Sequence, residues 1–101
     1  MLYSRDSRIE AAPLQEETIL LQPEAKTFCL LNRTATFIWN EASVPVSSES
    51  IARRLALTFD GVSPQRALSD VEATLRQLVS MGFVRTHDTR TPVSTRIRQA
   101  E

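Results

Sequence analysis

The chain has 101 residues, and its 12 basic and 12 acidic side chains leave no net charge when its one histidine is neutral. This length allows one domain, and the zero net charge argues against a dedicated nucleic-acid-binding domain, which usually carries a clear basic excess. One cysteine, one histidine and two glycines are too few for an internal disulfide, a usual zinc site or a glycine-rich phosphate loop.

The first ten residues do not have the pattern of a signal peptide. Charged side chains between Met1 and Glu10 leave no apolar signal-peptide region, and no segment approaches the roughly 20 apolar residues of a membrane span. We therefore expect a cytoplasmic protein with no membrane partner. Its predicted organisation is a flexible N-terminus over residues 1–7, a folded domain over residues 8–86 and a flexible polar tail over residues 87–101.

Residues 8–31 have the composition of β-strands. Ile9–Leu14 contains Pro13 and suits the edge of a sheet. Thr18–Gln22 and Thr27–Leu31 are richer in β-compatible side chains, and the turn-forming Pro23–Lys26 between them predicts a hairpin. Neither face of Thr27–Leu31 is strongly polar, so we expect both faces of this strand to be at least partly covered.

After residue 31 the apolar residues take helical spacing. Asn32 can cap a first helix, and either Ser47 or Ser48 can cap a second. Ser63 can cap the third helix, Pro64–Met81, which has proline at its first position. A short strand, Phe83–Thr86, follows it. Three helices followed by a strand are a winged-helix arrangement. The predicted fold class is therefore α+β, with an N-terminal three-stranded antiparallel sheet packed on a winged-helix trihelical bundle.

Side chains that could perform chemistry are few and scattered. Cys29 lies within an apolar strand, where a thiol is usually an inert small hydrophobe. His87 begins the polar tail and has no rigid partner nearby in the sequence. The carboxylates of Glu16 and Glu17 are neighbours on a strand and point to opposite faces. We therefore expect no enzymatic activity, no metal site and no cofactor.

Two functions that require no catalytic activity of this chain on its own stay open at this point. A winged helix can bind DNA, and the third helix offers Arg66 and Arg76 for phosphate contacts. Asp70 and Glu72 on the same helix would repel phosphate, so a nucleic-acid partner is the weaker expectation. The chain could also be a structural subunit of a larger enzyme.

The segment Thr27–Leu31 favours a binding function. Apart from Lys26 at its start, it lacks the charged side chains that usually protect a strand edge. Such an edge could receive an extended peptide as an additional strand, although the same pattern is equally compatible with a central strand. An apolar edge could also pair with a second copy of the chain, which leaves a homodimer open.

The segment Leu31–Trp39 reads Leu-Asn-Arg-Thr-Ala-Thr-Phe-Ile-Trp and resembles the Leu-Asn-x-Thr-Ala-x-x-Ile-Trp signature of PqqD-like proteins. This family is also described as the RiPP recognition element, the domain that binds the precursors of ribosomally made, modified peptides. Glu49–Leu55 is similar to the family's second helix, and Asp70–Val84 is similar to its third helix and closing strand. We expect Ile38 and Trp39 of the signature to lie in the core.

The resemblance implies a function as well as a fold. In the family, the leader of a precursor peptide lies between the third strand and the third helix as a fourth antiparallel strand. This chain would then be a non-catalytic adaptor that binds a leader peptide and presents it to a separate modifying or cleaving enzyme. Many members have a glycine in the hairpin turn, and its absence from Pro23–Lys26 predicts a wider hairpin. The strand residues that the resemblance assigns to the peptide are Lys26, Thr27, Phe28, Cys29, Leu30 and Leu31.

One shoulder of the third helix, to one side of its core residue Leu75, would form the other wall of the binding site. We favour the shoulder with Ala67 and Thr74, because small side chains leave room for an inserted peptide side chain. The Thr74 hydroxyl could bond a peptide group, and Asp70 could pair with a basic leader residue. At about 3.6 residues per turn, the favoured shoulder is Ala67, Asp70, Thr74 and Met81, and the opposite one is Glu72, Arg76 and Val79.

Overall fold

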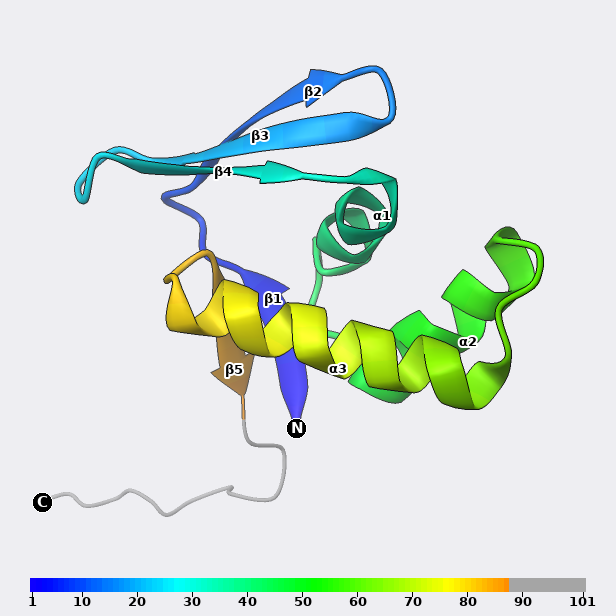
Figure 1. The fold of residues 1–101 in the computed structure, drawn as a ribbon. Coiled ribbons are helices and arrows are strands. Elements are labelled where there is room, and N and C mark those ends of the chain that lie inside the picture. Colours follow the sequence, from blue (N-terminus) through cyan, green and yellow to red (C-terminus); the bar gives the residue numbers. More distant parts are fainter. Residues whose placement is uncertain (88–101) are drawn as a thin grey trace, which may run out of the picture.

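Three helices and two small antiparallel sheets form residues 1–87, the part of the chain that this computed structural model describes (Figure 1). The elements in chain order are β1 (Leu2–Arg5), β2 (Glu10–Leu14), β3 (Glu17–Gln22), β4 (Thr27–Leu31), α1 (Arg33–Glu41), α2 (Ser48–Thr58), α3 (Pro64–Ser80) and β5 (Val84–His87). The larger sheet has the strand order β2-β3-β4, and the smaller one pairs β1 with β5. The rest of the tail predicted for residues 87–101 lies outside the described residues.

The larger sheet confirms the three predicted strands and the hairpin. Leu20 of β3 lies opposite Cys29 of β4, and Gln22 lies opposite Thr27 at the turn. The turn has no glycine, and Lys26 adopts a left-handed backbone with φ of 56° in it. This conformation costs a residue with a side chain about 1 kcal/mol. Pro13 lies in β2 at the edge of the sheet, where its missing N–H is tolerated.

The three helices begin at the caps that the sequence predicts. The Asn32 side chain accepts a hydrogen bond from the Ala35 amide at 2.8 Å, which satisfies a free donor of the first turn of α1. Ser47, rather than Ser48, caps α2 by accepting from the Ser50 amide at 3.1 Å. The Ser63 hydroxyl caps α3 in the same way. No helix within residues 1–87 has the length and apolar character needed to cross a membrane.

The core lies on the inner face of the larger sheet, and all three helices lie on that side of it (Figure 1). Among the helices, α1 packs directly on β3 and β4. Ile38 and Trp39 of α1 are buried in it, as predicted. Leu75 of α3 is fully buried and confirms the orientation expected for this helix. The other buried apolar residues of the core are Leu20, Leu31, Ile51, Ala52, Leu55, Ala67, Val71, Leu78, Phe83 and Val84.

The outer face of the larger sheet corrects the expectation that both faces of β4 are covered. Phe28 is 75% exposed and Leu30 is 57% exposed. Both lie on the face opposite Cys29 and Leu31, because side chains alternate along a strand. The helices cover only the inner face, so nothing among residues 1–87 packs over these two side chains.

The N-terminus also differs from its prediction as a flexible segment. Leu2–Arg5 forms β1, which pairs with β5, and Tyr3 exchanges two backbone hydrogen bonds with Val46, at 2.7 and 3.0 Å. Its partners are far away in the sequence, so local pattern cannot reveal the strand. The folded part therefore begins before residue 8, and His87, expected as the first residue of the tail, is the last residue of β5.

Candidate functional site

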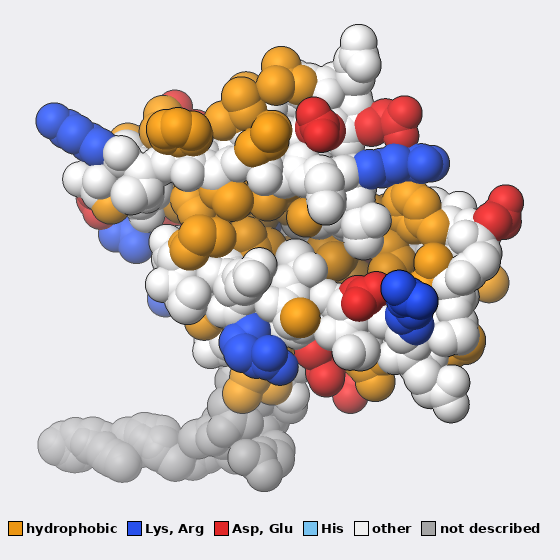
Figure 2. All heavy atoms as spheres, in the orientation of Figure 1, with side chains coloured by type: hydrophobic (Ala, Val, Ile, Leu, Met, Phe, Trp, Pro, Cys, Tyr) orange, Lys and Arg blue, Asp and Glu red, His pale blue; other side chains and the backbone are white. Residues whose placement is uncertain are grey.

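A groove of about 440 Å³ lies between β4 and α3. Figure 2 shows apolar side chains in the hollow between the larger sheet at the top and α3 below it. The sheet wall comes from β4 and the start of α1, and the opposite wall comes from one side of α3. The lining residues are Cys29, Leu30, Leu31, Asn32, Thr34, Ala35, Asp70, Ala73, Thr74, Gln77, Leu78 and Met81.

The edge of β4 at this groove is suited to accept another strand. β4 is an outer strand of the sheet, so one row of its N–H and C=O groups has no partner strand among residues 1–87. Thr27–Leu31 contains neither proline nor a charged side chain, the usual features that prevent pairing at an edge. The other edge, β2, contains Pro13. The open edge of β4 is therefore the better receiver for an extended chain.

The predicted strand residues divide between the groove and the sheet edge beyond it. Cys29, Leu30 and Leu31 line the groove. Lys26 and Thr27 lie at the turn end of β4, outside the lining, and the Phe28 side chain lies on the outer face. A role for these last three residues through their backbone stays a prediction.

Three of the four residues predicted on the favoured side of α3 line the groove, and the fourth does not. Asp70, Thr74 and Met81 line it, whereas Glu72 and Arg76 of the opposite shoulder line a separate hollow beside β1 and β5. Ala67 is fully buried in the core and does not line the groove.

Sequence reasoning missed lining residues on both walls. Ala73 and Gln77 lie about 160° around the helix from Leu75, beyond Thr74 at about 100°. The groove wall is thus further from the core than the predicted shoulder. Asn32, Thr34 and Ala35 come from the cap and first turn of α1. Because these residues directly follow β4 in the sequence, their place beside the open strand could have been predicted.

Asp70 is the one charged side chain among the groove lining. It forms no ion pair within residues 1–87, and the remaining lining is apolar or neutral and polar. A groove of this kind suits an extended peptide held by backbone hydrogen bonds. It does not suit a phosphate backbone, which needs basic side chains.

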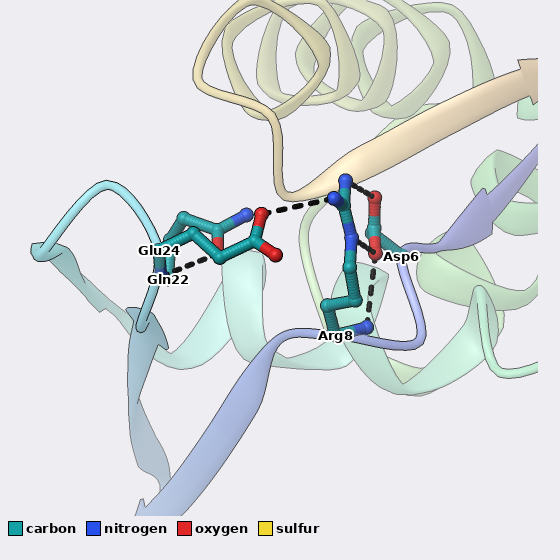
Figure 3. Close-up of polar contacts among 4 residues, drawn as sticks. All are labelled: Asp6, Arg8, Gln22 and Glu24. Carbon is teal, nitrogen blue, oxygen red and sulfur yellow. Dashed lines mark hydrogen bonds and ion pairs between the residues drawn. The ribbon is translucent and has the colours of Figure 1, made fainter.

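A polar cluster fixes the hairpin that carries β4 (Figure 3). The Asp6 carboxylate accepts hydrogen bonds from the backbone amide and the guanidinium of Arg8, and the same guanidinium reaches Glu24 in the hairpin turn at 3.0 Å. The Glu24 amide in turn donates to the Gln22 side chain. Hydrogen bonds from the side chain and backbone of Arg8 lower the pKa of Asp6 to about 2.

Cys29 and His87 have no catalytic partner among their contacts within residues 1–87. The Cys29 thiol is 3.9 Å from the Leu30 carbonyl oxygen. His87 has a rigid partner after all, because the Ser4 hydroxyl lies 2.7 Å from its Nε2. This pair is exposed on the small sheet. Across residues 1–87, no cluster of three or more His, Cys, Asp or Glu side chains could hold a metal ion.

Comparisons with known proteins agree with this geometry. The family described as "Coenzyme PQQ synthesis protein D (PqqD)" matches residues 17–84, from β3 to the start of β5. The match includes the Leu31–Trp39 segment and confirms the resemblance seen there. A search of curated proteins gives no match.

Two solved structures share the fold. The first, "TbiB1 in Complex with the TbiA(beta) Leader Peptide", has a TM-score of 0.76 and 18% identity, over 84% of this chain and 98% of that one. The second, "Lasso peptide synthetase B1 complexed with the leader peptide", has a TM-score of 0.73 and 21% identity, over 83% of this chain and 98% of that one.

Proposed function

Because the chain belongs to the family of coenzyme PQQ synthesis protein D (PqqD), we propose that it is a non-catalytic adaptor for a precursor peptide. It binds the leader of a ribosomally made precursor in the cytoplasm and presents the peptide to a separate modifying or cleaving enzyme. The observation that carries the proposal is the open edge of β4, which faces α3 across a groove.

Strand addition to β4 explains how this groove can hold a peptide. Five residues of β4 extend over about 17 Å, which suits a short extended segment. Backbone hydrogen bonds to the free edge supply affinity, and alternate side chains supply specificity. The inward side chains meet Cys29, Leu31 and the buried Leu78, so small or apolar leader residues fit this part.

The two solved structures support a peptide as the ligand. Both are named as complexes with a leader peptide, and each is almost fully covered by the fold of this chain. We extend that ligand class to this chain because its own groove has the required open strand and neutral walls.

The adaptor acts by bringing the peptide to an enzyme. Binding both partners raises the effective concentration of the peptide at the enzyme's active site. The chemistry then belongs to the enzyme, and this chain's own residues only hold and orient the peptide.

Titration of the isotope-labelled protein tests the proposal. The probes are synthetic peptides that cover the N-terminal segments of any short reading frames found beside this chain's gene. Binding is followed by amide spectra and amide exchange. We expect saturable one-to-one binding, shifts that map to β4 and to the groove side of α3, and slower exchange at the β4 edge. Shifts confined to the hollow at Tyr3 and Arg76, or no saturable binding, would show that the proposal is wrong.

A further inference from the structure

A second hollow of about 240 Å³ adjoins the peptide groove just past the end of β4. Thr34 and Asp70 line both spaces, so the two hollows lie side by side. We name it the side pocket. Its lining residues are Thr34, Leu55, Phe59, Asp60, Val62 and Asp70.

The floor of the side pocket is apolar and firmly packed. Leu55 is buried in the core, and Phe59 and Val62 pack against it. The Phe59 ring meets the Phe37 ring edge-on, with centroids 5.6 Å apart. The Arg33 guanidinium lies 4.8 Å above the same ring. These contacts hold Phe59 in place, so the floor can receive the aliphatic part of an inserted side chain.

Two carboxylates, those of Asp60 and Asp70, line the same pocket. Both residues are exposed, and neither takes part in an ion pair within residues 1–87. Arg33, the cation stacked on the pocket floor, is bound to Glu16 at 2.7 Å. Arg66 lies one helical turn before Asp70, yet no ion pair joins them. Neither carboxylate of the pocket is therefore neutralised by a direct ion pair within residues 1–87.

We propose that the side pocket receives a lysine or arginine side chain of the bound peptide. The aliphatic stem covers Leu55, Phe59 and Val62, and the cationic head lies with Asp60 and Asp70. Long basic side chains commonly bury their stems in this way while their charge stays near water. An apolar side chain would desolvate the two carboxylates without a partner, and an acidic one would be repelled.

The position of the pocket also sets where this residue lies in the peptide. The pocket adjoins Thr34, just beyond the Leu31 end of β4. In an antiparallel addition, the N-terminal part of the peptide lies beside the C-terminal end of the receiving strand. The basic residue therefore precedes the strand-forming segment of the leader. This inference rests on the proposed function.

Selection from a peptide library tests the side pocket without a known ligand. Phage-displayed random 12-residue peptides are selected on the immobilised full chain and on the double variant D60K/D70K. We expect the wild type to enrich lysine or arginine at one fixed position before an apolar, β-compatible stretch. The double variant should enrich aspartate or glutamate at that position. Glu10→Lys, an acidic-to-lysine substitution at one position on the outer face of β2, serves as the control and should select like the wild type.

The outcomes separate the two proposals. If neither the wild type nor the control enriches any common peptide, peptide binding itself is wrong. If the wild type enriches β-compatible peptides without a basic position, or D60K/D70K selects the same peptides, the side pocket is wrong and strand addition stands.

A second measurement covers the case in which the lysine variant does not fold. For a synthetic selected peptide, replacing its basic residue with norleucine should weaken binding to the wild type about fivefold. The same replacement should leave binding to D60N/D70N unchanged. Equal losses in both proteins would overturn the assignment.

Discussion

Arg5 of β1 lies over Trp39 of α1, with its guanidinium carbon 4.9 Å from the ring centroid. Its Nε also donates a hydrogen bond to the Trp39 carbonyl oxygen at 3.0 Å, and its Nη2 reaches Asn40 at 3.2 Å. Trp39 belongs to the segment that carries the family resemblance. The N-terminal strand is thus attached directly to the most characteristic part of the domain.

Replacing Arg5 with alanine should therefore destabilise the whole domain. Loss of the stacking and of the hydrogen bonds should lower the free energy of unfolding by about 1–2 kcal/mol, measured by urea denaturation. Arg53→Ala is the control, because Arg53 is exposed and bonds only within its own helix; it should change stability by less than about 0.5 kcal/mol. Equal effects of the two variants would show that β1 contributes nothing through Arg5.

The contrast between β1 and the helix caps shows which parts of this fold the sequence could predict. Asn32, Ser47 and Ser63 accept hydrogen bonds from amides only three residues away. Their capping roles can therefore be predicted from the local sequence. β1 depends on β5 and Val46, and its four residues have no distinctive pattern of their own. Long-range pairing of a short strand is therefore what the sequence could not show.

In the candidate site, too, the features set by local sequence could be predicted and those set by long-range packing could not. The favoured side of α3 could be predicted from helical periodicity, and Asp70, Thr74 and Met81 do line the groove. Ala67 could not be excluded, because its burial depends on how the helices pack together in the core. The side pocket likewise depends on how the residues after α2 fold back beside α3. A place for Asp60 in the site could therefore not be predicted from the sequence.

Asp6 should make stability depend on pH in a narrow acidic range. Its carboxylate is 6% exposed, and its pKa is lowered from 3.8 to about 2. A lowered pKa in the folded state stabilises the fold above the ordinary pKa, and this contribution is lost as the pH falls from about 4 towards 2. Asp6→Asn should therefore be less stable than the wild type by about 1–2 kcal/mol at neutral pH, and the difference should shrink steadily as the pH falls from about 4 through 2.

Unfolding curves recorded at a series of pH values check this prediction. Glu24→Gln is the matched control, because Glu24 is mostly exposed and contacts the same Arg8 guanidinium. Its stability should stay close to that of the wild type at every pH. A constant difference between Asp6→Asn and the wild type over the whole acidic range would contradict the assigned role of Asp6.

A large side chain at position 73 should block the groove without harming the fold. Ala73 is exposed on α3 and lines the groove, so the tryptophan of Ala73→Trp would occupy the space of the peptide. We expect leader affinity to fall at least tenfold, measured by fluorescence anisotropy, with little change in stability. Arg76→Trp places the same side chain one helical turn further along, at the separate hollow beside β1 and β5, and should leave affinity intact. Equal affinities of both variants would mean that the peptide lies elsewhere.

Proline substitutions in β4 test strand addition at the level of single hydrogen bonds. Successive N–H groups of a strand point alternately to its two sides. The N–H groups of Cys29 and Leu30 therefore point in opposite directions, one towards β3 and the other towards the open edge. Proline removes the donor. One of Cys29→Pro and Leu30→Pro should therefore lose stability through the β3–β4 ladder. The other should stay folded and bind the leader at least fivefold more weakly, which is about one lost hydrogen bond.

The alanine variants at the same two positions separate the backbone effect from the side-chain effect. Cys29→Ala and Leu30→Ala keep both N–H groups, so each should retain the hydrogen-bonding pattern of β4. Stability is measured by thermal unfolding and affinity by titration with the same leader. If the proline variant that stays folded binds as tightly as its alanine counterpart, the peptide does not pair with β4 in this register. If both proline variants unfold, the hydrogen-bond donor can be removed from the peptide instead. A peptide that is N-methylated at the amide facing β4 should then bind the wild type more weakly by the same factor.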